Sequence, residues 1–430
     1  MKTVIWDQLS QAQREEILTR PAVSSKLDIK GIVTDIVQRI KTEKDKALLE
    51  ISARLDHVAD GRLKLSQEEI REKIGRVSEE LKQALNHAYH NIALFHENQR
   101  HHPVTVHTEA GVTCELHTHA IDNVGLYVPG GSAPLVSTVL MLGVPAQIAG
   151  CKKVVLCSPP PIADEIVYAA SLCGISEIYG IGGAQAIAAM AYGTETVSKV
   201  DKIFGPGNAF VTEAKKQISG DSRGAAIDMP AGPSEVLVIA DASANPAFVA
   251  ADLLSQAEHG PDSQVILVTD SADLAARVNE EIDRQLALLP RKDIASRSLD
   301  ASRAIVCSDL KEACAISNTY APEHLILQVT GARSLLHELR NAGSIFIGSW
   351  TPEAVGDYAS GTNHTLPTYG YARTYSSLGL ADFERRYTVQ ELTREALGHL
   401  EDTIVKMTDA EGLMAHQRAV TIRLGHFKGE

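Results

Sequence analysis

The stretch Val124-Gly-Leu-Tyr-Val-Pro-Gly-Gly131 joins a short aliphatic run to a turn of proline and glycine. Similar runs recur along the chain and alternate with longer, alanine-rich windows of helical periodicity. The further runs span residues 153–157, 177–181, 202–204, 236–240, 265–269, 304–307, 325–329 and 344–347. Such a pattern is typical of parallel sheets covered on both faces, so it predicts an α/β fold. Because runs fall on each side of residue 240, two α/β units are predicted.

Both ends of the chain are predicted to be helical. Ser66-Gln-Glu-Glu69 has the pattern of a capping box, and the helix after it would present an apolar face from Leu81 to Ile92. From about Leu380 the chain becomes charged, and Thr388-Val-Gln-Glu391 predicts the start of an amphipathic helix that continues to the end. A segment this short could hardly fold alone, so it is expected to pack on this chain or on a second copy.

Composition limits the partners and the compartment. The formal charge of −13 argues against nucleic acid or a membrane surface as a partner. Prolines and glycines interrupt the uncharged stretch Asn123–Cys151, which excludes a membrane-spanning helix there, and Met1–Asp7 lacks the pattern of a secretory signal. The six cysteines form no Cys-x-x-Cys pair, so reduced thiols and a cytoplasmic enzyme are expected.

Three glycine turns are candidates for a nucleotide site: Gly125–Gly131, Gly180–Gln185 and Gly205–Asn208. Glycine between a strand and a helix lets backbone amides approach a ligand phosphate. None of the three completes the fingerprint G-x-G-x-x-G, so tight turns that only serve the fold explain them equally well.

Polar side chains in three segments are candidates for metal binding or proton transfer. Gly260 and Pro261 would end a helix and place Gln256 and His259 on one face of its last turn, as metal ligands or as a surface pair. Glu323 and His324 precede a strand and offer two proton-transfer groups, or a polar loop. The loop of residues 356–364 contains Asp357 and His364.

Two further pairs, each with at least one histidine, are ambiguous. His117 and His119 alternate on a predicted strand, so both rings project to one side, where they could bind a metal. Glu411 and His416 would lie about 140° apart around the terminal helix and flank one groove. The chain contains no H-E-x-x-H, G-x-S-x-G or P-loop motif, which excludes the common metalloprotease, esterase and NTPase templates.

Taken together, these segments resemble the histidinol dehydrogenases, in the order in which that family has them. The motifs are Gly125-Leu-Tyr-Val-Pro-Gly-Gly-Ser-Ala-Pro134, Gly182-Gly-Ala-Gln-Ala-Ile187, Phe204-Gly-Pro-Gly-Asn208, Asp228-Met-Pro-Ala-Gly-Pro-Ser-Glu235, Ser255-Gln-Ala-Glu-His-Gly260, Ala321-Pro-Glu-His324 and Gly361-Thr-Asn-His-Thr-Leu-Pro367. One departure is that residues 117–123 lack the basic residue that family members often have there.

The resemblance implies a zinc-dependent enzyme that ends histidine biosynthesis by oxidising L-histidinol to L-histidine through bound L-histidinaldehyde, with two NAD. One zinc ion per subunit would be held by Gln256, His259, Asp357 and, from the partner subunit of a homodimer, His416. His324 would exchange protons with substrate and Glu323 would activate water. The implied substrate contacts are Ser234, Gln256, His259, His324, Asp357, Glu411 and His416, and the implied NAD contacts are Tyr127, Gln185 and Asn208. His364 is given no definite role.

The resemblance also implies two doubly wound, Rossmann-like domains with parallel sheets, one inserted in the other, and helical arms used in dimerisation. The expected divisions are an N-terminal arm (1–25), a first α/β domain for metal and substrate (26–125 and 235–379), an inserted α/β domain on the NAD side (126–234) and a C-terminal arm (380–430). A zinc hydrolase with Glu323 as base and a ligand-binding sensor are the alternatives that the residues leave open.

Overall fold

The computed structural model describes residues 1–21, 28–58, 61–130, 134–230 and 232–425. The chain forms two compact units, the first from Met1–Gln99 and Ile121–Phe383 and the second from Arg100–Ala120 and Glu384–Glu430. The first unit contains two parallel sheets, which confirms the predicted α/β fold. Among the described residues, no helix has both the length and the apolar character needed to cross a bilayer.

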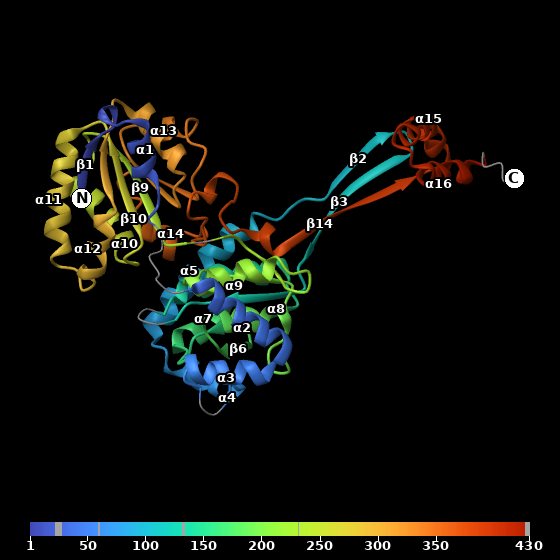
Figure 1. Ribbon diagram of the computed structural model, residues 1–430, viewed down its shortest axis with the longest axis horizontal. Helices are drawn as coiled ribbons and strands as arrows, with labels where there is room; N and C mark the ends of the chain where they lie inside the picture. Colours follow the sequence, from blue (N-terminus) through green and yellow to red (C-terminus); the bar gives the residue numbers. More distant parts are fainter. Residues whose placement is uncertain (22–27, 59–60, 131–133, 231, 426–430) are drawn as a thin grey trace. The chain divides into compact units, whose positions relative to one another are not determined.

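The larger sheet is parallel and has the strand order β1-β11-β10-β9-β12-β13 (Figure 1). Its strands are β1 (Lys2–Ile5), β9 (Glu235–Ala240), β10 (Gln264–Thr269), β11 (Arg303–Val306), β12 (His324–Gln328) and β13 (Ser344–Ile347). One face is covered by α10 (Pro246–Ala257), α11 (Ala272–Leu286) and α12 (Lys292–Asp300), and the other by α1 (Gln11–Leu18) and α13 (Leu310–Tyr320). The short strand β1, at an edge of this sheet, lies where only helices were predicted.

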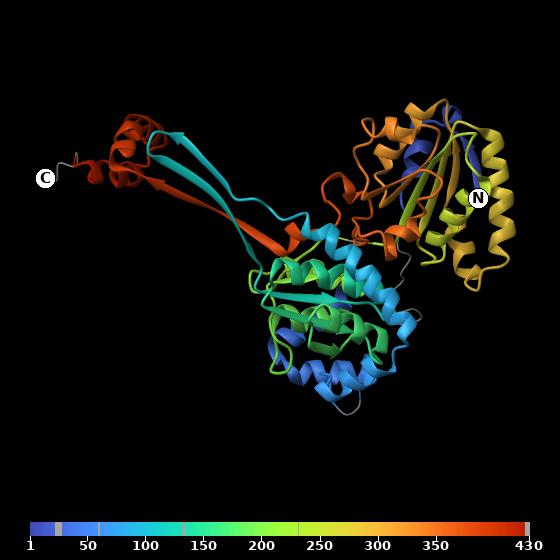
Figure 2. The same cartoon turned by 180° about the vertical axis from the view of Figure 1, so that it is seen from behind.

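The smaller sheet is also parallel, with the order β6-β5-β4-β7-β8. Figure 2 shows this sheet among helices coloured from blue to green. Its strands are β4 (Asn123–Tyr127), β5 (Lys153–Ser158), β6 (Glu177–Gly180), β7 (Lys202–Phe204) and β8 (Ala226–Ile227). One face is covered by α2 (Ile29–Glu43), α3 (Asp45–Leu55), α8 (Gly183–Tyr192) and α9 (Ala209–Ser219), and the other by α4 (Gln67–Arg76), α5 (Glu79–Glu97), α6 (Val136–Ala149) and α7 (Asp164–Leu172). The predicted capping box opens α4, where Ser66 and Glu69 bond each other's backbone N–H groups.

The packing of the N-terminal helices differs from the expected domain division. We expected residues 26–125 to belong with 235–379, but the apolar faces of α2 to α5 are buried against the smaller sheet. Val33 and Ile40 of α2 and Ile92 of α5, for example, are fully buried in its two cores. The strands of the smaller sheet do fall between β1 and β9 of the larger one in sequence, as an insertion requires.

Both sheets are doubly wound, because the first strand of each series lies at the centre and later strands are added first on one side and then on the other. In chain order within its own sheet, β4 to β8 are arranged 3-2-1-4-5, and β9 to β13 repeat this order with β1 added at the edge. The carboxyl ends of β4 and β7 lead into two of the glycine turns, as the doubly wound fold predicts for a ligand site. In the larger sheet, by contrast, the candidate residues Ser234 and Glu323 precede β9 and β12, at the amino edge.

The second unit contains an antiparallel sheet of the order β14-β3-β2 and two helices. They are β2 (Val104–Glu109), β3 (Val112–Ala120), β14 (Glu384–Leu392), α15 (Arg394–Glu411) and α16 (Met414–Leu424). The predicted capping box at Thr388–Glu391 is wrong, since these residues pair with β3. The helix begins later, where the Thr393 side chain accepts the N–H of Ala396, and a left-handed turn at Gly412 divides the predicted single helix in two.

Candidate active site

Two cavities of the first unit contain most of the candidate residues. The polar cavity, of about 130 Å³, is lined by Ser234, Gln256, His259, Glu323, His324, Asp357 and His364, together with Thr138 of α6 and other residues. The glycine-lined cavity, of about 490 Å³, is lined by Tyr127, Gln185 and Asn208 together with residues of α2 and α3. Residues of the Gly205–Asn208 loop line both: Gly205 and Pro206 the first, Asn208 the second.

The short helix α14 (Glu353–Tyr358) brings two carboxyl groups to the polar cavity region. Glu353 is buried and accepts hydrogen bonds from Ser255 Oγ at 2.8 Å and from Gln256 Nε2. Because the amide NH₂ of Gln256 is directed at Glu353, its Oε1 atom must face elsewhere, and this oxygen is buried without a hydrogen-bond partner. A buried, unpaired acceptor is costly, so Gln256 Oε1 is a strong candidate for a ligand atom.

Gln256 and His259 differ slightly from the arrangement predicted for them. The helix α10 ends at Ala257, so His259 lies beyond the C-cap residue Glu258 instead of in the last turn. Its backbone N–H donates to Gln256 O at 3.2 Å, which keeps the two residues together. Although the His259 side chain is exposed, desolvation by the cavity walls lowers its pKa, which favours the neutral imidazole that binds metals.

His259, Glu353 and Asp357 each offer a ligand atom, and these atoms all lie within 4.8 Å of one another. Burial raises the pKa of Glu353 to about 8, whereas Asp357, which burial alone would shift upward, has its pKa lowered by the neighbouring His324. Gln256 lines the same cavity and has an unpaired Oε1 atom, so the residues there offer nitrogen and oxygen donors, which suit a zinc ion. The residues present therefore fit the metal implied by the sequence.

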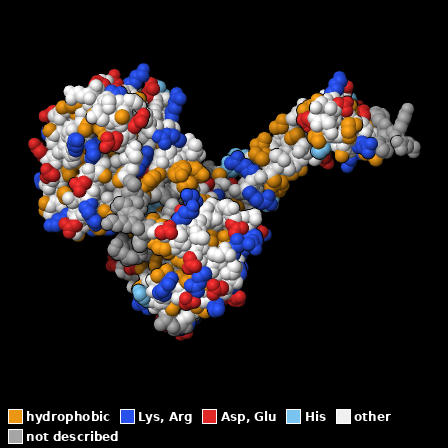
Figure 3. All heavy atoms as spheres, viewed as in Figure 1, with side chains coloured by type: hydrophobic (Ala, Val, Ile, Leu, Met, Phe, Trp, Pro, Cys, Tyr) orange, Lys and Arg blue, Asp and Glu red, His pale blue; other side chains and the backbone are white. Residues whose placement is uncertain are grey.

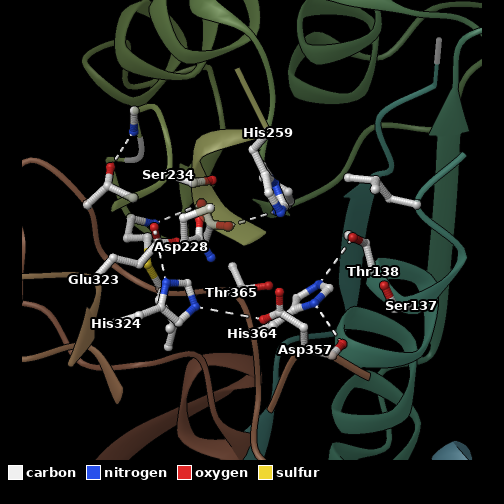
Figure 4. Close-up of a pocket in the computed structure, with 18 of the residues that line it drawn as sticks. Ser137, Thr138, Asp228, Ser234, His259, Glu323, His324, Asp357, His364 and Thr365 are labelled. Atoms are coloured by element: carbon white, nitrogen blue, oxygen red, sulfur yellow. Dashed lines mark hydrogen bonds and ion pairs between the residues drawn. The ribbon is translucent and has the colours of Figure 1, made fainter. Parts of the chain in front are cut away.

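The tautomer of His324 follows from its backbone contact. Its Nδ1 atom lies 3.1 Å from the carbonyl oxygen of Glu235, which can only accept, so Nδ1 carries a proton. The Nε2 atom is buried without a hydrogen-bond partner and lies 3.7 Å from Asp357 Oδ1 (Figure 4). Burial lowers the pKa of His324, but Glu323 and Glu353 outweigh it and raise the pKa well above its usual range. Because Nδ1 keeps its proton, Nε2 is the ring atom that gains or loses a proton at the cavity.

The backbone of Glu235, which contacts His324, also holds Glu323. The Glu323 Oε2 atom accepts the N–H of Glu235 at 2.8 Å and lies 3.5 Å from His324 Nδ1, and burial raises the pKa of Glu323. The side chain of Glu235 is itself fixed by a buried, bidentate pair with Arg20, at 2.9 and 2.8 Å. The two proton-transfer groups therefore share one rigid support at the amino edge of the larger sheet.

His364 connects α14 of the polar cavity to α6, which packs on the smaller sheet. Its Nδ1 atom lies 3.1 Å from the backbone oxygen of Asp357, and its Nε2 atom lies 3.1 Å from Thr138 Oγ1 on α6 (Figure 4). Since the carbonyl only accepts, Nδ1 donates and Nε2 accepts from the threonine hydroxyl. Burial lowers the pKa of His364, which fits this neutral, bridging role.

Tyr127, Gln185 and Asn208 come together at the carboxyl edge of the smaller sheet, although 81 residues of sequence separate the first from the last. Each is engaged within the protein. Tyr127 Oη accepts the N–H of Gly183, Gln185 Nε2 donates to Asp56, and Asn208 Oδ1 caps α9. The motif residues Gly131, Ser132, Ala133 and Ala231, and the expected boundary at residue 25, lie outside the described residues.

Glu411 and His416 belong to the second unit, and both are exposed there. Glu411 ends α15 and His416 lies in α16, so they are not on one helix as predicted. His117 and His119 do project to one side of β3, where both rings stack on Tyr387. Their Nε2 atoms already lie 2.6 Å from Glu115 and 2.8 Å from Tyr387 Oη, which disfavours a metal at that pair.

Sequence reasoning missed Glu353, which orients Gln256. Glu353 follows Pro352 in an otherwise unremarkable segment, but it lies four residues before Asp357. Carboxylates four apart on a helix share a face, and this spacing was the available signal.

Comparison with known proteins identifies the family of the chain. The family model described as histidinol dehydrogenase matches residues 18–424. Histidinol dehydrogenase of Photobacterium profundum is 62% identical over 99% of this chain and 96% of its own, and that of Escherichia coli K12 is 59% identical over 98% of each. The crystal structure of histidinol dehydrogenase from Elizabethkingia anophelis superposes with a TM-score of 0.95 at 48% identity, covering 99% of this chain and 98% of that one.

Proposed function

The chain belongs to the histidinol dehydrogenase family of NAD-dependent oxidoreductases, and on that premise we propose that it oxidises L-histidinol to L-histidine in two steps at the polar cavity. The observation that carries the assignment of the site is the buried, unpaired Gln256 Oε1 in the cavity that His259 and Asp357 also line, with His324 Nε2 3.7 Å from Asp357. Two NAD molecules are reduced, one in each step.

Gln256, His259 and Asp357 would hold zinc together with the partner subunit's His416. The bound ion would supply a positive centre that holds the imidazole and amino nitrogens of the substrate. Ser234 and the partner subunit's Glu411 would contact the same substrate. Glu353 would act through Gln256, whose amide it orients.

The protein's own groups account for the proton transfers. In the first oxidation, His324 Nε2 takes the proton of the substrate hydroxyl as hydride leaves the same carbon for NAD, giving the aldehyde. Glu323 then takes a proton from water as the water oxygen adds to the aldehyde carbon, and the former carbonyl oxygen takes back the proton that His324 had gained. This gives the hydrate and returns His324 to its neutral form. In the second oxidation His324 again accepts a hydroxyl proton, now from the hydrate, and hydride leaves for a second NAD, giving the acid. Burial of both side chains keeps the aldehyde away from bulk solvent.

The surface of the second unit supports a homodimer with shared sites. Hydrophobic side chains are exposed along its strands and helices (Figure 3). They are Val104, Val106, Val389, Leu392, Met407, Leu413, Met414 and Ile422. Exposed apolar groups in this number are typical of a protein interface. A second copy that covers them would bring His416 and Glu411 to a site they complete.

The experiment that tests the function is a spectrophotometric assay with L-histidinol and NAD. Reduced cofactor should accumulate only when both are present. The alternative of a zinc hydrolase predicts turnover that does not depend on NAD. Absence of NADH from zinc-loaded protein would contradict the proposal.

We expect Glu353→Gln to lower the affinity for zinc by about 10- to 100-fold, because the new amide can donate as well as accept and no longer determines which way the Gln256 amide points. Competition with a chromogenic chelator measures this affinity. Glu79→Gln, at an exposed ion pair with Lys82, is the matched control and should bind zinc as the wild type does. Unchanged zinc affinity in Glu353→Gln would contradict the role assigned to Glu353.

We expect Gln256→Ala and His416→Ala to be inactive alone and to regain activity when mixed. A heterodimer of the two variants has one site with both ligands intact, so random exchange should restore about a quarter of wild-type activity. Turnover is measured after mixing under conditions that allow subunits to exchange. If exchange is verified and no activity returns, His416 is not supplied by the partner subunit.

A further inference from the structure

Hydrogen bonds within the protein limit which donor and acceptor atoms the three proposed NAD contacts can present to a ligand. Because Tyr127 Oη accepts the N–H of Gly183 at 3.1 Å, its own O–H remains free to donate. Asn208 Oδ1 accepts the N–H groups of Phe210 and Val211, so its Nδ2 atom remains as a donor. The cavity therefore offers two neutral donors, which suit phosphate oxygens.

Asp56 directs the Gln185 amide so that this residue presents an acceptor, in contrast to the donors of Tyr127 and Asn208. The Gln185 Nε2 atom donates to Asp56 Oδ2 at 3.0 Å, and a carboxylate cannot donate in return. This bond fixes the Nε2 end of the amide at Asp56, so the carbonyl Oε1 is the acceptor that Gln185 can offer a ligand. Gln185 therefore presents an acceptor, which suits a hydroxyl or amino group of a nucleoside and not a phosphate.

Asp56 also occupies the start of α8. Its Oδ1 atom accepts the N–H of Gly182, the N-cap residue, at 3.2 Å. In doubly wound nucleotide-binding folds this position often receives the cofactor's phosphates, but a carboxylate there repels them. Arg54 is the only cationic side chain among the described residues that line the cavity, so it is the group that attracts phosphate.

Asp56 lies at an electrostatically unfavourable position. It is the C-cap residue of α3, where the helix dipole disfavours a negative charge. Its contacts with α8 offset this cost. We propose that Asp56 is a positioning residue for NAD, which fixes the Gln185 amide with its carbonyl available to the nucleoside and keeps phosphate away from the start of α8. This inference rests on the proposed function.

The test is a double-mutant cycle of Asp56→Asn and Gln185→Ala, read out as NADH affinity by fluorescence titration of the zinc-loaded full chain. Asp56→Asn should weaken NADH binding by about tenfold, because an asparagine no longer dictates which way the Gln185 amide points. In the Gln185→Ala background the same change should cost less than about twofold. L-Histidinol binding should stay unchanged, and Asp56→Glu should bind NADH more tightly than Asp56→Asn.

Glu50→Gln, an exposed carboxylate of the same helix, is the matched control and should bind NADH normally. NADH affinity of Asp56→Asn within twofold of wild type, or additive effects in the cycle, would overturn the inference. An unfolded Asp56→Asn variant, seen as a lost melting transition, would overturn it too, since Asp56 would then serve the fold. None of these results affects NAD-dependent turnover by the wild type, on which the proposed function is judged.

Discussion

His324→Asn is expected to lower kcat by about 100- to 10,000-fold, the range typical of a lost general base. Asparagine keeps a donor near the Glu235 carbonyl, which Nδ1 now contacts, but it provides no basic atom in place of Nε2. Zinc content should be retained, because the side chains proposed to hold zinc are others, and the zinc should keep most of the L-histidinol affinity even though His324 also contacts the substrate. Steady-state kinetics and calorimetric titration with L-histidinol measure the two properties separately.

The matched control for this prediction is His337→Asn, which makes the same substitution at an exposed histidine beside Glu338. It should keep wild-type kcat. A His324→Asn variant that turns over at more than about a tenth of the wild-type rate would remove His324 from the proton-transfer steps. Loss of L-histidinol binding together with turnover would instead assign His324 to substrate binding.

Removal of the metal is expected to have an effect of similar size. Chelation should lower turnover by about a hundredfold or more, since a substrate held in the wrong place reacts poorly even with its catalytic groups intact. L-Histidinol affinity should fall with it. NADH affinity should not, because the residues proposed to bind zinc and NAD line different cavities. Metal analysis, titration and kinetics on the same chelated sample make this comparison.

Adding zinc back should restore both turnover and L-histidinol binding in proportion to the metal bound. A control sample incubated with chelator already saturated with zinc should remain active. Full turnover by protein that metal analysis shows to be zinc-free would contradict the role proposed for Gln256, His259 and Asp357. A parallel fall in NADH affinity would mean that the two cavities do not bind independently.

The sequence predicts the strands of the two α/β sheets that are buried on both faces. All nine aliphatic runs, such as residues 202–204 and 344–347, became strands within one or two residues of the predicted bounds. Strands that are exposed, or that depend on distant partners, were not predicted. β1 has little buried surface, and β14 pairs with β3 from more than 260 residues away, so the local pattern at Thr388 was misleading.

Site residues that lie in a sequence motif could be predicted from the sequence. Residues that reach the site only through the packing of helices could not. His324 and Gln256 lie in short, polar motifs that carry the family resemblance. Glu353 and Asp56 lie in ordinary helical segments, and only the packing of α14 against α10, and of α3 beside α8, brings them to Gln256 and Gln185. No local spacing predicts such contacts between helices.

The most direct test of the central claim is the amount of NADH formed from limiting L-histidinol in the presence of excess NAD. Complete conversion by the zinc-loaded protein should yield two NADH for each L-histidinol, because both oxidations occur before the product leaves. The other product should be L-histidine, quantified by chromatography in the same sample. One NADH for each substrate, with aldehyde as the product, would contradict the account, and so would no NADH at all.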